Sequence, residues 1–379
     1  MLSLDRFLFA FMVFSSGINK TKDIYFKYER YITPAAFLAG FIWDNLTLRR
    51  IDLLFENLTF IWNLLIVGVG IILINGYEAG LIRWRFADRF LKFAPLLMQF
   101  SFGGLFSAFF VFYSRSASVF SSWPFLLFLL VLFVGNDFFR KRYLRLTFQL
   151  SVFFIALFSY SVFALPVLFG KMGAVVFIAS GIVSLLVIGG VIFLLWKIVP
   201  EKVKKSQHAL VFCIGGIFFA FQFSYFANVI PPIPLSLKES GIYHSVERIS
   251  NDSYIYKVSY ERAPWYLFFE DQSSVFHLEP DSKVYIYSAI FAPTKIETLI
   301  LHRWLYFDAE KKDWIEMSRV PFSISGGRDG GYRGYTYKSS VKPGKWRVEV
   351  INDRGQVLGH RTFKVVEDDL IGELATEYK

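Results

Sequence analysis

The side chains best suited to bind an anion or a sugar lie in the C-terminal third of the chain. His302 stands in a strand-like stretch, and Arg328 and Arg333 belong to a glycine-rich segment that leads into Tyr335. An arginine fork can hold a carboxylate or phosphate through two parallel hydrogen bonds, and glycines let the backbone approach the ligand closely. We therefore predict that His302, Arg328, Arg333 and Tyr335 contribute to an external binding site.

The same region also has a purely structural interpretation, which the sequence leaves open. Alternation along a strand puts His302 and Trp304 on one side and Arg303 on the other. In this interpretation Trp304 and Trp346 are core residues. Arg303 and Arg347 then pair with strand neighbours such as Glu349.

A second polar cluster, residues 44–57, begins within the first apolar run of the chain, Ile32–Leu48. It contains Asp44, Arg49, Arg50 and Asp52. One interpretation is an outward-facing site in which the two arginines hold an anionic group and an aspartate orients them. The other is an interfacial amphipathic hairpin whose charges pair with one another.

No motif for catalysis, metal binding or cofactor binding is present in the sequence. The glycine-rich segment lacks a following Gly-Lys-Ser/Thr, five histidines are scattered, and the single cysteine, Cys213, lies in an apolar run. We therefore expect no catalytic residue, no metal and no cofactor. The sequence favours a protein that is not an enzyme.

Long apolar runs dominate the first 230 residues, and each is long enough to be considered as a membrane span. There are seven of them: Ile32–Leu48, Leu58–Ile74, Phe93–Tyr113, Ala117–Gly135, Thr147–Phe169, Met172–Trp196 and Ala209–Ile230. The segments that precede and separate them alternate in basic charge, with seventeen lysines and arginines in one set and four in the other. Because basic loops stay in the cytoplasm, we predict a cytoplasmic N-terminus and an external C-terminal region.

The net charge of +10 does not indicate nucleic-acid binding. Residues 231–379 hold 20 basic and 21 acidic side chains, so the excess lies in the first 230 residues, with 21 basic and 10 acidic ones. Basic loops beside membrane spans meet the anionic headgroups of the lipid bilayer. The bilayer is therefore the expected partner, and nucleic acid is not.

The composition of the chain changes at residue 231, from long apolar runs to short strand-like stretches. We therefore predict a membrane domain (1–230), a proline-rich exit linker (231–240) and an external β-domain (241–379). Period-two alternation, clearest over residues 346–350, predicts an antiparallel β-sandwich. Ten strands are expected: Ile242–Ile249, Tyr254–Tyr260, Trp265–Glu270, Lys283–Phe291, Leu299–Phe307, Trp314–Met317, Pro321–Ile324, Tyr332–Ser339, Lys345–Ile351 and Val357–Val366.

Three stretches carry a resemblance to a known family. They are His302-Arg303-Trp304-Leu305-Tyr306, the segment from Gly326 to Val350 that includes Pro343-Gly344-Lys345-Trp346, and Arg354-Gly355-Gln356-Val357-Leu358-Gly359. Their order and spacing resemble a bacterial envelope family known only as a domain of unknown function. The stretch Trp43–Asp52 also resembles the helical region that similar members carry. The resemblance implies an inner-membrane protein with a periplasmic β-domain, and it implies no activity.

Two functions fit these patterns. The first is a non-enzymatic envelope protein whose external β-sandwich binds a polysaccharide, peptidoglycan or another envelope protein. The second is a membrane-embedded enzyme or transporter for an anionic or lipid-linked substrate that uses the cluster at residues 44–57. The aromatic-rich external region favours the first.

Overall fold

A computed structural model describes most of the chain beyond residue 52. The described residues are 53–81, 94–116, 119–135, 145–232, 234–249, 255–266, 271–279, 282–293, 297–325, 331–367 and 374–379, with the single residues 42, 44, 46 and 48. The chain divides into two compact units, Met1–Arg49 and Arg50–Lys379. The second unit contains every helix and strand discussed below.

Six long helices precede the strands in the described residues. They are α3 (Leu54–Glu78), α5 (Ala94–Ser116), α6 (Val119–Gly135), α7 (Leu146–Phe169), α8 (Ala174–Ile198) and α9 (Pro200–Phe226). Five are long and apolar enough to cross a membrane, whereas α6 has a shorter apolar stretch, Ser122–Val134. These helices match the last six predicted spans, although seven spans are not shown. The first predicted span, Ile32–Leu48, lies almost wholly outside the described residues.

Aromatic packing and small side chains hold the helices together. Phe158 of α7 stacks on Phe221 of α9, with ring centroids 4.6 Å apart. The hydroxyl of Ser184 on α8 donates to Ser161 Oγ of α7 at 3.0 Å. Small residues let the backbones approach, as they do in lipid-embedded bundles. Large side chains such as Phe212 and Phe223 remain exposed on the outside of α9, which suits contact with lipid.

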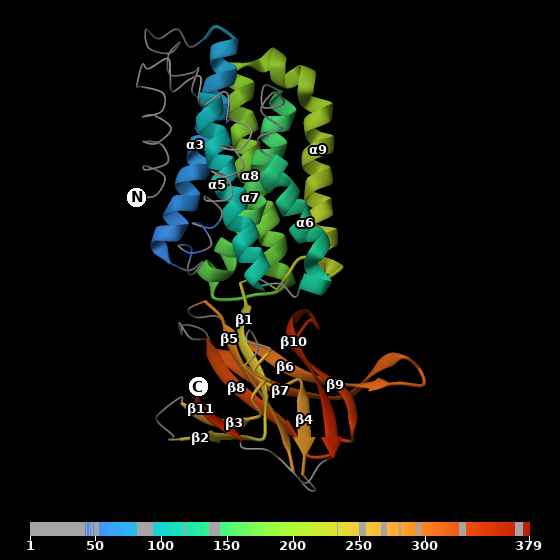
Figure 1. The fold of residues 1–379 in the computed structure, drawn as a ribbon. Coiled ribbons are helices and arrows are strands. Elements are labelled where there is room, and N and C mark those ends of the chain that lie inside the picture. The colour runs from blue at the N-terminus through green and yellow to red at the C-terminus, as the bar shows by residue number, and fades with distance from the viewer. Residues whose placement is uncertain are drawn as a thin grey trace, which may run out of the picture. The chain divides into compact units, whose positions relative to one another are not determined.

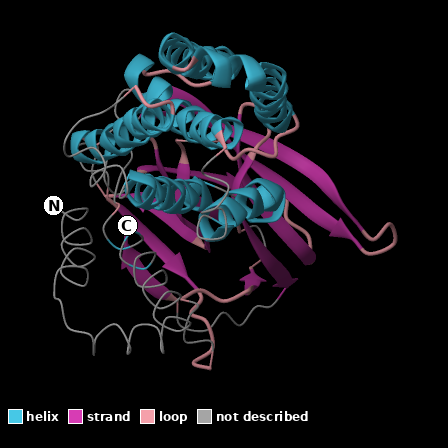
Figure 2. Cartoon of the chain, turned by 90° about the horizontal axis from the view of Figure 1, so that it is seen from above, coloured by secondary structure: helices cyan, strands magenta, loops and turns pink. Residues whose placement is uncertain are grey.

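Eleven strands follow in the described residues and form three sheets (Figures 1 and 2). They are β1 (Ser236–Tyr243), β2 (Ser245–Arg248), β3 (Tyr256–Tyr260), β4 (Val275–Leu278), β5 (Val284–Phe291), β6 (Glu297–Asp308), β7 (Asp313–Ser325), β8 (Tyr332–Lys338), β9 (Gly344–Asn352), β10 (Val357–Glu367) and β11 (Ala375–Tyr378). The strand orders are β1-β5-β8, β4-β10-β9-β6-β7 and β11-β3-β2.

Strand β5 lies in the middle of three layers. Val284 and Ile286 pack against Trp304 and Trp346 of the five-stranded sheet. Tyr287, on the opposite face of β5, packs in a separate cluster with residues of β2 and β3. Because both faces of the strand are covered, nearly every residue of β5 is buried. The arrangement therefore has one layer more than the predicted two-sheet sandwich.

The structure corrects the predicted strand pattern in five places. The strand expected at Ile242–Ile249 is two strands of different sheets, β1 and β2, and β1 begins at Ser236, inside the predicted linker. β4 was not predicted, and it pairs with β10 in parallel, so the five-stranded sheet is mixed rather than antiparallel. β11 was also missed. The two short strands expected at 314–317 and 321–324 are one long strand, β7, because β6 pairs with it along its whole length. The strand expected at Trp265–Glu270 begins instead with a turn at residues 265 and 266, and the rest lies outside the described residues.

Candidate functional site

A row of tyrosines lies on the face of the sheet β1-β5-β8 that is turned away from the five-stranded sheet. The third sheet covers part of this face, where Tyr256 of β3 packs against Tyr335 with ring centroids 5.8 Å apart. The register pairs Tyr285 of β5 with Tyr337 of β8, and Tyr287 with Tyr335. Paired residues share a face, so these four rings lie on the side of the sheet that points away from the five-stranded sheet. We call Tyr285, Tyr335, Tyr337 and the flanking Lys283 and Arg333 the tyrosine face.

The rings of the tyrosine face contact one another while keeping part of their surface open. The centroids of Tyr285 and Tyr337 are 5.5 Å apart, and those of Tyr285 and Tyr335 are 6.2 Å apart. Tyr335 and Tyr337 are 37% and 49% exposed, although β8 belongs to a packed sheet. Adjacent rings held by strand pairing form a stiff apolar surface that carries hydroxyl groups at its rim.

The two cations of the tyrosine face, Lys283 and Arg333, lie beside its rings. Lys283 Nζ lies 4.6 Å from the centroid of the Tyr337 ring, as in a cation–π contact. Arg333 pairs with Ala289 in the register, two residues before Tyr335 on the same strand face. Arg333 is a diagonal neighbour of Tyr287 in this register. Burial raises the pKa of the Tyr287 hydroxyl, and the charge of Arg333 opposes that rise. The face can therefore take a ligand with apolar and anionic portions.

His302 does not belong to this face, and the prediction that it lies at the surface is wrong. Its side chain is fully buried between the sheets. Its Nε2 lies 3.0 Å from Ser288 Oγ and its Nδ1 lies 2.9 Å from Thr336 Oγ1. Burial lowers the pKa of His302 to about 3, so the ring is neutral at pH 7. Ser288 of β5 and Thr336 of β8 lie on the face of the sheet opposite the tyrosines.

The structural interpretation of the tryptophans and arginines is confirmed. Trp304 and Trp346 are fully buried. Arg303 donates from both Nε and Nη2 to Glu349 Oε2, and the Nε bond is 3.0 Å long. Arg347 Nη1 lies 3.9 Å from Glu349 Oε1. These residues hold β6 and β9 together.

Only some of the remaining predicted residues are among those that the structure describes. Arg328 lies outside the described residues, as do Arg49, Arg50 and Asp52 of the second cluster. Asp44 is described as helical and half-buried within the first unit. Glu56 is buried in the first turn of α3, and Asn57 Oδ1 accepts a 3.1 Å hydrogen bond from the Tyr160 hydroxyl. A function for this cluster stays a prediction.

A histidine–carboxylate group in the β-region was not predicted. Glu261 Oε1 lies 2.9 Å from His244 Nε2, and Glu261 Oε2 lies 2.7 Å from His277 Nδ1. The backbone N–H of His277 also donates to Glu261 Oε1 at 2.7 Å. Burial raises the pKa of Glu261, but these hydrogen bonds outweigh it and leave the pKa lowered. Among the described residues, no group of three or more potential ligands is arranged to hold a metal ion.

Comparisons with known proteins place one part of the chain. No curated protein matches the chain. A solved structure, the alkylpurine DNA glycosylase AlkC of Pseudomonas fluorescens bound to DNA containing an abasic site analog, is similar over 83% of this chain and 99% of that one. Its identity is 10% and its TM-score 0.20, so this likeness carries no argument. Residues 297–365, from β6 to β10, match the family model described as Protein of unknown function (DUF2914), in agreement with the resemblance seen in the sequence.

Proposed function

We propose that this chain is a multi-pass protein of a bacterial inner membrane whose β-region faces the outside and binds an envelope polysaccharide on the tyrosine face. The observation that carries this proposal is the pair of half-exposed rings Tyr335 and Tyr337 at the end strand of a packed sheet. The role proposed is binding rather than catalysis.

A sugar polymer fits this surface better than an extended apolar partner does. Tyrosine rings offer an apolar face for the C–H groups of a sugar ring and a hydroxyl for its oxygens. Lys283 and Arg333 add charge at the border, which suits a polymer that carries carboxylate or phosphate groups. Because the rings are fixed by neighbouring strands, little side-chain entropy is lost on binding.

The proposed orientation rests on the distribution of basic residues. Seven spans with a cytoplasmic N-terminus place every basic-rich flank inside and the β-region in the periplasm. The five helices that could cross a membrane are compatible with a multi-pass arrangement.

One experiment tests both the site and the side of the membrane. Right-side-out and inside-out membrane vesicles that contain the full chain are each incubated with two fluorescent probes, purified peptidoglycan fragments and a soluble envelope polysaccharide. We expect binding of the polysaccharide to right-side-out vesicles alone. Tyr335→Ala combined with Tyr337→Ala should weaken that binding by roughly tenfold or more, as for hot-spot aromatics.

Tyr378→Ala is the matched control, because Tyr378 is exposed on a different sheet. It should bind the polysaccharide as the unmodified chain does. Binding to inside-out vesicles would overturn the orientation. Equal binding by the double variant and the control would overturn the tyrosine face, and peptidoglycan binding in place of polysaccharide binding would change the ligand. A protein partner would show as an envelope cross-link that requires both tyrosines while neither probe binds.

A further inference from the structure

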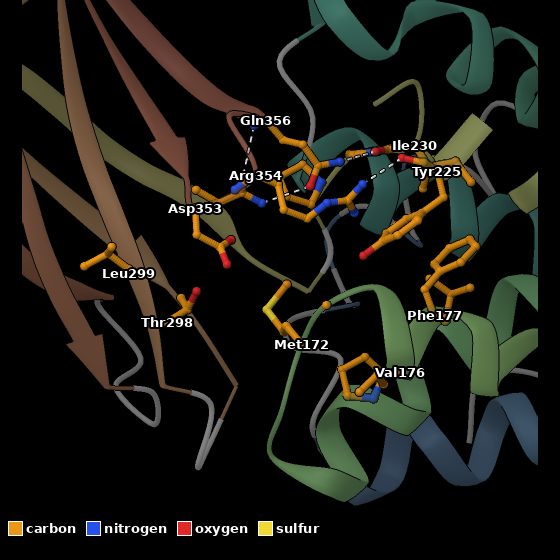
Figure 3. Close-up of a pocket in the computed structure, with 16 residues that line it drawn as sticks. Met172, Val176, Phe177, Tyr225, Ile230, Thr298, Leu299, Asp353, Arg354 and Gln356 are labelled. Atoms are coloured by element: carbon orange, nitrogen blue, oxygen red, sulfur yellow. Dashed lines mark hydrogen bonds between the residues drawn. The ribbon is translucent and has the colours of Figure 1, made fainter. Parts of the chain in front are cut away.

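A pocket of about 270 Å³ lies where the helices meet the β-region (Figure 3). Val162 of α7, Val176 and Phe177 of α8 and Tyr225 of α9 line its helical side. Thr298 of β6 and the turn Asn352–Gln356 between β9 and β10 line the other side. The volume is just below the range of about 300–1,000 Å³ that is usual for small-molecule sites, and it suits a small polar group.

The guanidinium of Arg354 is fixed at one side of this pocket. It stacks over the Tyr225 ring, 3.8 Å from the centroid. Its Nη2 donates to the Tyr225 carbonyl at 3.2 Å and lies 3.5 Å from Asn228 Oδ1. Its Nη1 is buried and has no hydrogen-bond partner in the described part of the chain. A buried cationic donor without a partner costs free energy that an anionic oxygen would recover.

The turn that carries Arg354 is itself tightly constrained. Asn352 Oδ1 accepts hydrogen bonds from the backbone N–H groups of Arg354 and Gln356, at 3.1 and 2.9 Å. Gly355 has a φ of 77°, a left-handed conformation that favours glycine. Gln356 Nε2 donates to the Ile230 carbonyl at 3.0 Å and ties the turn to the end of the helical region. The backbone that carries Arg354 is therefore fixed before any ligand binds, and only the guanidinium has to turn for its buried Nη1 to reach an anion.

A negative charge faces the same pocket. Asp353 is exposed, and Figure 3 shows its carboxylate on the Thr298 side of the pocket, away from the guanidinium of Arg354. A cation and an anion at opposite sides of one small pocket match a ligand that carries both charges. A simple anion would be repelled by Asp353 and is a poorer fit.

The depth of the pocket indicates the source of such a ligand. α7 ends at Phe169, α8 begins at Ala174 and α9 ends at Phe226, so the pocket lies level with the ends of helices that could cross a membrane. Lipid headgroups lie at that level. Apolar side chains of α7 and α8, among them Val162, Pro166 and Val176, line the helical side of the pocket.

We propose that this pocket binds the headgroup of a phospholipid that carries a phosphate and a primary ammonium, as phosphatidylethanolamine does. Arg354 Nη1 donates to the phosphate, Asp353 accepts from the ammonium, and the acyl chains lie along α7 and α8. This site is independent of the tyrosine face, and its lipid links the β-region to the bundle.

Native mass spectrometry of the delipidated full chain in detergent tests the proposal. The protein is titrated with phosphatidylethanolamine and phosphatidylglycerol of the same acyl chains, and phosphoethanolamine and inorganic phosphate are used as competitors. We expect phosphatidylethanolamine to bind more tightly, and phosphoethanolamine to compete better than phosphate. Arg354→Gln should weaken both lipids by about tenfold or more. Asp353→Asn should remove the preference and leave phosphatidylglycerol binding intact.

Val176→Phe separates binding from folding, because it narrows the pocket without removing any contact of Arg354. It should weaken both lipids while the melting temperature of the lipid-free protein stays unchanged. Arg319→Gln and Asp313→Asn, far from the pocket lining, are controls that should bind as the unmodified chain does. Unchanged lipid binding by Val176→Phe would overturn the site. Equal affinity of the unmodified chain for both lipids, or competition by phosphate equal to that by phosphoethanolamine, would overturn the ammonium contact. Phosphoethanolamine binding as tightly as phosphatidylethanolamine would overturn the lipid source.

Discussion

Two histidine groups in the β-region differ in the hydrogen-bond partners of their ring nitrogens. His302 is fully buried and has hydroxyl groups, Ser288 and Thr336, at both ring nitrogens. His244 and His277 share the carboxylate of Glu261 and are only partly buried. Hydroxyls can donate to one nitrogen and accept from the other, so they satisfy a neutral ring completely. A carboxylate accepts only, so it suits ring N–H donors and can support a positive charge.

The difference shows why burial alone does not identify a functional histidine. Burial opposes protonation of the hydroxyl-paired ring, because a charged ring would lose its hydration in a low-dielectric setting. The role of His302 is therefore to join strands β5, β6 and β8. The carboxylate-paired group links β4 to the segments beside β1 and β3. Each group therefore crosslinks layers, but only one of them is built around a charge.

The largest effect in this comparison is expected for His302→Ala. The substitution leaves two buried hydroxyls without a ring partner and opens a cavity, so the β-region should lose about 3–5 kcal/mol of stability. Hydrogen exchange of peptides from β5, β6 and β8 in the detergent-solubilised full chain measures the loss. His360→Ala is the control, because His360 is more exposed and should cost less than about 1 kcal/mol. Equal losses would mean that the hydroxyl pairing contributes nothing.

An intermediate effect is expected on acidification from pH 7 to pH 5. The pKa of His302 is about 3 in the folded chain, against an ordinary value of 6.5. Below pH 6.5 His302 binds a proton in the unfolded chain but stays neutral in the folded chain. The free energy of unfolding therefore falls by about 2 kcal/mol between pH 7 and pH 5. Hydrogen exchange corrected for intrinsic rates at each pH measures this fall. His302→Gln, which cannot titrate, should be less stable at pH 7 but should lose most of this pH dependence. If that variant loses as much stability between pH 7 and pH 5 as the unmodified chain does, another group causes the pH dependence.

A smaller effect is expected for Glu261→Gln. The pKa of Glu261 is lowered in the folded chain, so its ionised form stabilises the fold above its ordinary pKa, and that contribution is lost at lower pH. Because the group is only partly buried, the substitution should cost about 1–2 kcal/mol at pH 7, measured by exchange at β4. Glu316→Gln, in an exposed pair with Arg319, should change little. A loss as large as that of His302→Ala would contradict the distinction between the two groups.

Sequence patterns predicted the elements better than their partners. Period two predicted β9, because the core residues Trp346, Val348 and Val350 alternate with the charged residues Arg347 and Glu349. β4 has only four residues, and its partner β10 follows much later in the chain and runs parallel to it. No local pattern encodes such a pairing, so both the strand and the mixed sheet were missed.

The candidate site was partly within reach of the sequence. The Tyr-x-Tyr repeats at 285–287 and 335–337 mark a tyrosine-bearing face, although only Tyr335 was singled out. The burial of His302 also had a signal, since it shares a strand face with Trp304. The pocket at the junction had none. Arg354 and Tyr225 are separated by 129 residues and meet only through the docking of a turn on the end of a helix.

Because a chain is synthesised from its N-terminus, the position of β11 sets the order in which the three sheets can be completed. Its register pairs Ala375 with Tyr260, and the backbone of Lys379 exchanges two 2.9 Å hydrogen bonds with Tyr256. The five-stranded sheet and the sheet β1-β5-β8 can assemble once β10 has emerged, but the sheet β11-β3-β2 cannot be completed until β11 arrives. The neighbouring Tyr287 cluster on β5 therefore stays incompletely covered until β11 has paired. During that interval a chaperone would find an open hydrophobic surface.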